Sequence, residues 1–471
     1  MAQAAAPADP ALGAALLRAI EARLPAVRLL TDPVDLEAYR RDETAYLEPP
    51  PPLAVAQPTE TSEVAELVGL AAQHRVPIVP RGAGSGLSGG AISVAGGLTI
   101  SFMRMNRILE IDPANLVVVT QPGVLNAVLK RAVAAEGLFY APDPASTEIC
   151  SIGGNLGTNA GGLCCLKYGV TRDAVVGLEI VTAAGDVVRL GGRTTKDVAG
   201  YGLIPLIVGS QGTLALITEA TLRLRPAPPP KATLLAFFPS LVAAGDAVSA
   251  MAAAGVEPCT LELLDQTTIR AVDDDHGLGL DRDAAAMLMI ESDLPGSAAT
   301  RALELAEAAC LGAGAVSTIV AADQAEADML RQARRLAFNS MERLGVARME
   351  DVGVPRGRVP ELLAEIERIG REQGLTIATF GHVGDGNLHP NIILERDDPN
   401  GEAKLERACD ALYRAAIALG GTVTAEHGIG ASRRGYLELQ RGAGAVALMR
   451  AVKSAFDPMG ILNPGKVLPD A

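Results

Sequence analysis

Three of the five histidines in the chain fall near its C-terminal end. His382 and His389 lie within the glycine-rich segment 381–390, and His427 directly follows Glu426. Imidazole and carboxylate groups together are a usual ligand set for a divalent transition metal, and an incomplete set leaves positions open for substrate oxygens. The spacing therefore predicts a metal site. The alternative is that these histidines are core or surface residues of a glycine-rich turn.

Glycine is unusually frequent and is concentrated in a few segments. The chain has 50 glycines in 471 residues, about 11% against roughly 7% in average chains. Residues 81–90 and 153–162 each hold five, and Gly-Ser-Gln-Gly-Thr follows at 209–213. Backbone N–H groups without side chains can surround a pyrophosphate. Two long, bare loops predict one extended ligand rather than mobile turns. The first is not a Rossmann fingerprint, because no helix pattern follows it directly.

The elements that must position these segments follow from periodicity. A first group has the expected order helix 12–24, strand 53–56, helix 61–72, strands 76–79, 98–102, 108–111 and 116–120, helix 125–135, a hairpin over 175–190, and strand 213–224. Four prolines between 226 and 230 then end regular pairing. They predict a domain boundary.

The second group mixes strands and helices without a βαβ order. Its expected strands are 233–238, 260–264, 286–290, 375–380 and 391–394, its expected helices are 242–254, 297–311, 324–344 and 402–419, and a last helix covers 445–456. This order is typical of an α+β domain on an antiparallel sheet. We therefore expect a first domain at 1–228, a second at 229–428, and a C-terminal segment at 429–471 that returns to the first.

Composition excludes several classes of function. The formal net charge is −14, which disfavours binding to nucleic acid or an anionic membrane surface. Six scattered cysteines without a C-x-x-C pair predict reduced, mostly buried thiols rather than a disulfide or zinc framework. No apolar run approaches about 18 residues, and no signal peptide is expected. We expect a cytoplasmic protein without a transmembrane segment.

Four segments together resemble a known family. Residues 81–91, 141–162, 166–169 and 209–226 resemble the PCMH-type FAD-binding domain of the vanillyl-alcohol oxidase superfamily. Over nearly its whole length the chain is similar to the group of glycolate oxidase catalytic subunits, D-lactate dehydrogenases and D-2-hydroxyglutarate dehydrogenases. The resemblance implies an α+β fold: an FAD-binding domain of two α+β subdomains and an α+β cap domain with an antiparallel sheet.

The resemblance also implies which residues hold FAD. Binding is expected to be noncovalent, since no histidine lies between His74 and His276. The residues implied in FAD binding are Pro80, Arg81, Gly82, Ala83, Gly84, Ser85, Gly86, Leu87, Ser88, Pro142, Ser146, Gly153, Gly154, Asn155, Thr158, Asn159, Gly162, Gly212, Ile217 and, in the closing Asn-Pro-Gly-Lys motif, Asn463.

A second set of residues is implied in catalysis. His382, His389 and Glu426 match the ligands of a divalent metal, with Zn or Mn expected, and His427 matches the proton-accepting base. Arg334 matches the arginine that binds the substrate carboxylate, and Asn391 a residue near the substrate. The neighbouring Arg331 and Arg335 are interpreted as solvated helix charges.

The implied activity is oxidation of a D-2-hydroxy acid to the 2-oxo acid by hydride transfer to flavin N5. Phe338, Met349 and Glu350 stand where the 2-hydroxyglutarate enzymes carry polar or cationic groups. This difference favours glycolate, D-lactate or a similar monocarboxylate. The alternatives are a D-2-hydroxyglutarate dehydrogenase, a noncatalytic flavin subunit that relays electrons and, from the histidines alone, a metal-dependent hydrolase.

Partners are implied by the same resemblance. Relatives pass electrons to a quinone, a cytochrome, an electron-transfer flavoprotein or a partner subunit, and no motif selects among these acceptors. An acceptor in the inner membrane would place the protein peripherally at that membrane. A homodimer is a further expectation, and no nucleic acid is expected as a partner.

Overall fold

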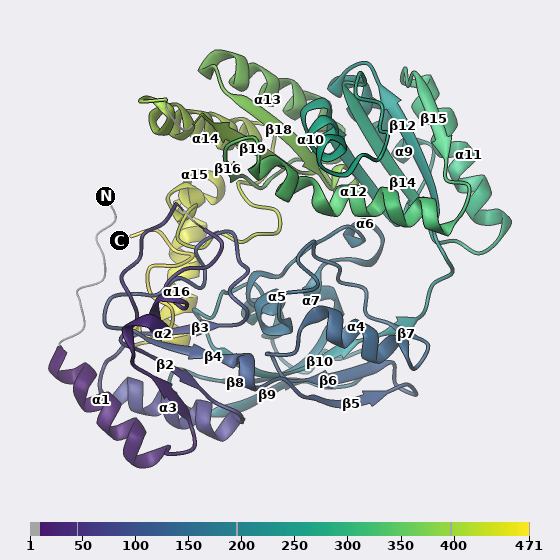
Figure 1. Ribbon diagram of the computed structural model, residues 1–471. Helices are drawn as coiled ribbons and strands as arrows, with labels where there is room; N and C mark the ends of the chain where they lie inside the picture. The colour runs from purple at the N-terminus through teal and green to yellow at the C-terminus, as the bar shows by residue number, and fades with distance from the viewer. Residues whose placement is uncertain (1–9, 45, 195, 396–397, 471) are drawn as a thin grey trace. The chain divides into compact units, whose positions relative to one another are not determined.

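The computed structural model describes residues 10–44, 46–194, 196–395 and 398–470, and they form two compact units (Figure 1). The first unit comprises Met1–Gly161, Gly169–Ala227 and Glu426–Ala471, and the second comprises Gly162–Tyr168 and Pro228–Ala425. The break between the units thus falls within the proline-rich segment. The assignment of 162–168 to the second unit was not indicated by the sequence pattern. Each unit is described by itself below.

The first unit contains a four-stranded sheet and a five-stranded sheet. The smaller sheet has the order β1-β2-β4-β3, in which β4 is parallel to both of its neighbours. The larger sheet is antiparallel, with the order β5-β6-β10-β8-β9. The strands are β1 Arg28–Leu30, β2 Ala54–Gln57, β3 Ile78–Arg81, β4 Leu98–Ser101, β5 Ile108–Asp112, β6 Val117–Thr120, β8 Val175–Val181, β9 Val187–Gly191 and β10 Leu216–Arg223, with a small pair formed by β7 Leu138–Phe139 and β11 Arg225–Pro226.

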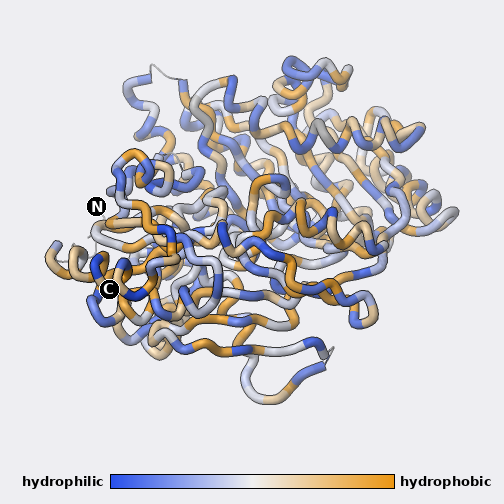
Figure 2. The backbone as a smooth tube through the Cα atoms, turned by 60° about the horizontal axis from the view of Figure 1, so that its bottom comes forward, coloured by the Kyte–Doolittle hydropathy of each residue, from blue (hydrophilic) through white to orange (hydrophobic). Residues whose placement is uncertain are grey.

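Helices cover these sheets through their apolar faces. Leu16 of α1 and Leu67 of α3 belong to the core of the four-stranded sheet, and Leu129 of α4 and Ile152 of α5 to that of the five-stranded sheet. The helices are α1 Pro10–Arg23, α2 Pro33–Glu37, α3 Thr61–Gln73, α4 Asn126–Ala134, α5 Ile152–Thr158, α7 Thr171–Ala174, α8 Ile204–Ile207, α15 Leu437–Arg441 and α16 Ala443–Phe456. Figure 2 shows hydrophobic and hydrophilic segments interspersed along the backbone.

The second unit is built on an eight-stranded antiparallel sheet. Its order is β15-β12-β14-β13-β18-β19-β16, and β17 also pairs with β19. The strands are β12 Ala232–Phe238, β13 Thr260–Asp265, β14 Ala286–Ser292, β15 Ser317–Val320, β16 Val346–Met349, β17 Val352–Gly353, β18 Thr376–Gly381 and β19 Asn387–Leu394. The expected antiparallel sheet is therefore confirmed.

Two groups of helices flank this sheet. Side chains of α10 and α12, such as Ile269 and Leu330, form one core with Leu264 and Phe380 of the sheet. The other helices contact one another in the order α11-α9-α13-α14. The helices are α6 Cys165–Tyr168, α9 Leu241–Ala253, α10 Gln266–His276, α11 Ser297–Gly312, α12 Gln324–Glu342, α13 Val359–Gln373 and α14 Gly401–Ala418. No described helix is long and apolar enough to cross a membrane.

Two local expectations were wrong. Residues 153–158 are not a loop but belong to α5, because Ser151 caps the helix by accepting from the Gly154 N–H and Ile152 is buried in the core. The last strand of the sheet begins at Asn387 rather than 391, since its pairing with β18 continues to the partners Phe380 and His389. His389 consequently lies in a strand and not in the turn.

The buried carboxylate of Asp265 gives stability a pH dependence. It accepts hydrogen bonds from the N–H groups of Thr268 and Thr379, at 2.8 and 2.6 Å. Desolvation raises its pKa to about 6, against about 3.9 in an unfolded chain. The folded protein therefore holds this proton more tightly than the unfolded chain. Stability falls as pH rises through the window from about 4 to 6.

We expect the free energy of unfolding to be lower at pH 7 than at pH 4 by roughly 2–3 kcal/mol from this group. Asp265→Asn should have a lower free energy of unfolding overall, and it should lack the pH-dependent contribution of this carboxyl group. Urea unfolding of both proteins at the two pH values measures the difference. Identical pH dependence in the two proteins would contradict the assignment.

Candidate active site

The first glycine segment forms the loop between β3 and β4, and Arg81 supports it. Gly84 has φ +83°, and a Cβ there would lie 2.1 Å from Arg81 Nη2. The buried guanidinium also donates to the Ala91 carbonyl and lies over the Tyr39 ring, 5.7 Å from its centroid. The Arg81 side chain thus supports the loop conformation, and the absence of a side chain at Gly84 leaves room for its guanidinium.

Ser151 joins the two glycine-rich segments. Its Oγ accepts from the Ala83 N–H and from the Gly154 N–H, both at 3.2 Å. A Cβ on Gly82 would lie 2.2 Å from this oxygen, and a Cβ on Gly153 would lie 2.6 Å from Pro122 Cβ. The contact with Ser151 therefore requires glycine at 82, and the contact with Pro122 requires glycine at 153.

Two asparagines of the second segment make structural bonds. Asn155 Oδ1 accepts from the Asn126 amide at 3.0 Å, and its side chain is buried. Asn159 ends α5 in the left-handed conformation, and its Oδ1 accepts from the Arg172 N–H. These hydrogen bonds of the two side chains fix the backbone conformation of the segment. Thr158 donates to the Gly154 carbonyl.

The third glycine segment meets the C-terminal segment at Gln211. Its buried amide donates to Ser88 Oγ at 3.2 Å and accepts from the Gly430 N–H at 2.8 Å. The Asn463 amide donates to the Gly90 and Gln211 carbonyls, at 2.9 and 2.6 Å. The expected return of the C-terminal segment to the first unit brings Asn463 to the first and the third glycine segments. Neither Gln211 nor Ser151 was predicted, because a single polar residue carries no periodic signal.

This part of the first unit fits an extended polar ligand. Bare backbone from three segments converges there, and neighbouring residues occupy the space that side chains at Gly82 and Gly90 would need. The buried Asn463 Oδ1 has no hydrogen-bond partner among the described residues. A buried acceptor of this kind requires a donor. Three other residues implied in FAD binding belong to the same unit: Pro142, Ser146 and Ile217, of which Ile217 is half-buried in β10.

The second unit brings two of the three clustered histidines together. His382 follows β18 and His389 lies in β19. Their rings are nearly perpendicular, with centroids 5.3 Å apart, and a ring nitrogen of one lies within 4.8 Å of a ring nitrogen of the other. Both side chains are buried, which limits access of water. The pair can provide two ligands of one ion.

Arg334 lies beside the histidines. It is on α12, with 3% of its surface exposed, and its Nε donates to Glu262 Oε2 at 2.6 Å. Its guanidinium lies over the Phe380 ring at 4.4 Å, and the same ring is 5.7 Å from that of His389. The Nη groups of Arg334 have no hydrogen-bond partner among the described residues. They are suited to a ligand carboxylate.

Glu262 also contacts His382, with Oε1 2.7 Å from Nδ1. Glu262 was not among the predicted residues, although its strand offered a signal. In Thr-Leu-Glu-Leu-Leu-Asp the two-residue period places Glu262 on the same face as the core residue Leu264. A carboxylate at a core position indicates a functional or paired group.

Asn391 and Asp351 complete the polar residues near His389. The Asn391 amide donates to the His389 carbonyl at 2.7 Å, and its buried Oδ1 has no partner among the described residues. Asp351 Oδ1 lies 3.9 Å from His389 Nδ1, and Oδ2 accepts from the Thr424 hydroxyl and the Ala425 N–H. Asp351 therefore fixes the end of the second unit beside His389.

Glu426 and His427 are the first residues of the C-terminal part of the first unit. A Cβ on Gly161 would lie 2.4 Å from Glu426 Oε2, so the carboxylate is directed toward the second glycine segment. His427 Nε2 lies 3.6 Å from Glu426 Oε1, and its carbonyl accepts from Ser88 Oγ at 3.0 Å. The first glycine segment thereby anchors His427.

Several charges near Arg334 are already paired. Arg331 was expected to be a solvated helix charge, and this expectation was wrong. Its side chain is only 15% exposed and pairs with Glu291 and Asp328. Arg335 is exposed. Glu350 is buried and contacts Arg348 and Tyr413.

The first unit presents glycine-rich backbone suited to a dinucleotide, and the second presents two buried histidines near the guanidinium of Arg334, as expected for a cofactor-dependent redox enzyme. The chain belongs to the FAD-linked oxidases: the C-terminal domain of this family matches residues 227–467, and an FAD binding domain matches residues 52–191. The protein thus binds FAD.

Relatives and solved structures support this assignment. The glycolate oxidase subunit GlcD of Bacillus subtilis is 46% identical over 88% of this chain and 89% of its own. The D-lactate dehydrogenase of Anaerostipes hadrus is 35% identical over 92% of each chain. Substrate-bound p-cresol methylhydroxylase has a TM-score of 0.82 at 17% identity, covering 98% of both chains, and confirms the PCMH-type fold.

Gly82→Ala should weaken FAD binding. The new methyl group would displace Ser151 Oγ and break its bonds to Ala83 and Gly154. Two hydrogen bonds of about 1 kcal/mol each correspond to a loss of affinity of tenfold or more. Titration of the deflavinated protein with FAD measures it. Gly69→Ala is the control, because a Cβ there meets nothing within 4 Å. Equal affinity in the two variants would show that the loop does not hold FAD.

Proposed function

We propose that the protein is an FAD-dependent dehydrogenase that oxidises a D-2-hydroxy monocarboxylic acid, glycolate or D-lactate, to the 2-oxo acid. The supporting observation is the buried group in the second unit, in which Arg334 presents two amino groups beside His382 and His389. An α-hydroxy acid has a carboxylate and a neighbouring hydroxyl group, and both need partners of this kind. The names of the relatives, glycolate oxidase and D-lactate dehydrogenase, agree with this chemistry.

The proposed metal site consists of His382, His389 and Glu426. Two imidazoles and a carboxylate are a common donor set for Zn²⁺ or Mn²⁺. The N–H of Ala425 is bonded to Asp351, which lies beside His389. Glu426 is the next residue along the chain and is proposed as the third ligand. A bound cation would supply the charge that lowers the pKa of a hydroxyl group.

The remaining roles belong to side chains of this chain. Arg334 binds the substrate carboxylate through its Nη groups, while Phe380 holds the guanidinium plane and excludes water. The Asn391 Oδ1 accepts a hydrogen bond from the bound substrate. His427, oriented by the bond from Ser88 to its carbonyl, accepts the hydroxyl proton at a ring nitrogen. FAD, when bound, supplies the two-electron acceptor for the hydride from carbon 2.

The charges around Arg334 favour a monocarboxylate. Arg331 lies one turn earlier on α12 and shares Glu291 with Lys231. Phe338, one turn later, packs on the core. A second substrate carboxylate would therefore meet paired cations and an aromatic ring. This arrangement favours glycolate or D-lactate over D-2-hydroxyglutarate.

Anaerobic titration of the oxidised protein with D and L acids tests the proposal. We expect D-lactate or glycolate to bleach the flavin absorbance, and D-2-hydroxyglutarate to require much higher concentrations. Bleaching by D-2-hydroxyglutarate at the lowest concentration would assign the alternative dehydrogenase. A flavin that no 2-hydroxy acid reduces would instead indicate a noncatalytic electron-relay subunit.

A further inference from the structure

We propose that Glu262 is a positioning residue that holds the substrate anchor Arg334 and the metal ligand His382 at the same time. This inference rests on the proposed function. Glu262 lies in β13, and its side chain is fully buried. One carboxylate oxygen accepts from Arg334 Nε at 2.6 Å, and the other lies 2.7 Å from His382 Nδ1.

The first consequence concerns the tautomer of His382. A carboxylate oxygen can accept a hydrogen bond but cannot donate one, so the proton of this pair must reside on Nδ1 of the imidazole. Nε2 then carries the lone pair and can bind a cation. Carboxylates that orient a metal-binding histidine in this way typically change metal affinity by 10- to 100-fold.

The second consequence concerns the orientation of Arg334. The bond to Glu262 holds the guanidinium at Nε, and the Phe380 ring at 4.4 Å fixes its plane. A planar, fixed guanidinium can bind a carboxylate through two parallel hydrogen bonds. Glu262 thereby sets the direction of the substrate carboxylate relative to His382.

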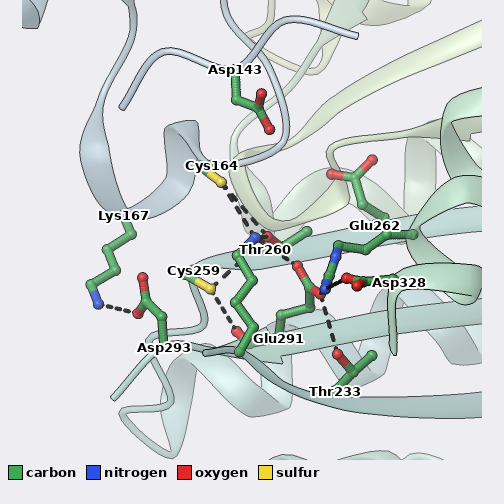
Figure 3. Close-up of polar contacts among 12 residues, drawn as sticks. Asp143, Cys164, Lys167, Thr233, Cys259, Thr260, Glu262, Glu291, Asp293 and Asp328 are labelled. Carbon is green, nitrogen blue, oxygen red and sulfur yellow. Dashed lines mark hydrogen bonds and ion pairs between the residues drawn. The ribbon is translucent and has the colours of Figure 1, made fainter. Parts of the chain in front are cut away.

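Glu291 offers a matched comparison on the neighbouring strand β14. It is equally buried, and it contacts Lys231, Arg331 and Thr233. Figure 3 shows Glu291 bonded to Thr233 beside Thr260 and Cys164, and Glu262 on the adjacent strand. No contact of Glu291 involves His382 or Arg334. The two glutamates share burial and arginine pairing and differ in their link to the site.

Glu262→Gln tests the inference because an amide has one accepting and one donating end. If its oxygen faces Arg334, its NH₂ group faces His382 Nδ1, which must then accept and transfer the proton to Nε2. If the amide is reversed, NH₂ meets the Nε–H of Arg334. One of the two functions is lost in either orientation.

The experiment measures Zn²⁺ affinity of the full-length, FAD-loaded protein after chelator treatment, by competition with a chromophoric chelator. We expect Glu262→Gln to bind Zn²⁺ about 10- to 100-fold more weakly, or to raise KM for D-lactate by a similar factor with the affinity for Zn²⁺ retained. Glu291→Gln should retain the Zn²⁺ affinity of the wild type. Flavin absorbance verifies that each variant is folded and loaded.

Wild-type Zn²⁺ affinity together with wild-type KM in Glu262→Gln would overturn the inference and leave the proposed function intact. An equal loss in Glu291→Gln would also overturn it, because burial alone would explain the effect. A wild-type protein that binds no divalent ion would instead contradict the proposed metal site. If Glu262→Gln does not fold, the same measurements of Zn²⁺ affinity and KM are made on Glu262→Asp. We expect a similar loss there, since the shorter aspartate side chain cannot reach both partners.

Discussion

Replacement of His389 by alanine is expected to abolish reduction of the bound flavin by D-lactate or glycolate while FAD remains bound. His389 is buried in β19, with its ring beside those of His382 and Phe380. Loss of one of three proposed ligands removes the cation that would stabilise the deprotonated hydroxyl. A cation contributes several kcal/mol to such a step, so we expect a rate lower by about a thousandfold or more.

Stopped-flow measurement of anaerobic flavin reduction checks this prediction. His276→Ala is the control, because His276 is an exposed residue at the end of α10. The flavin spectrum of His389→Ala should match that of the wild type, since His389 belongs to the second unit and the glycine-rich segments 82–90 and 153–161 to the first. Unchanged turnover in His389→Ala would remove the metal from the mechanism.

Arg334→Lys is expected to lower kcat/KM for the 2-hydroxy acid mainly through KM. Lysine keeps the positive charge, but it cannot donate to Glu262 and also present two parallel donors to a carboxylate. Weakening a buried, hydrogen-bonded charge pair typically costs 2–5 kcal/mol. We therefore expect kcat/KM to fall roughly 30-fold or more.

Steady-state kinetics of Arg334→Lys and Arg331→Lys separate this role from general charge effects. Arg331 lies on the same helix but pairs with Glu291 and Asp328. Its variant should retain a KM close to that of the wild type. If Arg334→Lys also retains wild-type kcat/KM, the substrate carboxylate is bound elsewhere.

Periodicity predicted most elements of the fold because they are long and regular. In the second unit, strands β12, β13, β14 and β18 and helices α9, α11, α12 and α14 were predicted close to their observed bounds, whereas the short strands β15, β16 and β17 and the helices α10 and α13 were not predicted. The glycine content of 153–158 concealed α5, since glycine is unfavourable in helices and here is required by the proximity of Pro122 to Gly153. Tertiary packing outweighed local propensity at this point.

Residue type and the resemblance indicated the chemistry of the site, but not its supporting contacts. His382, His389 and Arg334 were predicted from their types and motif positions, and the second unit brings these three together. Glu262 and Gln211 could not be assigned a partner from sequence, because Glu262 bonds Arg334 and His382, 72 and 120 positions away, and Gln211 bonds Ser88, 123 positions away. Such long-range partners depend on strand register and on the return of the C-terminal segment.

In the proposed reaction, a divalent cation and the flavin ring face the same substrate. Crystals of the FAD-loaded protein grown with Mn²⁺, with data collected at the manganese edge, test it most directly. We expect an anomalous peak bound by His382, His389 and Glu426 and adjacent to the isoalloxazine ring. A manganese peak elsewhere, or these three side chains far from the ring, would contradict it.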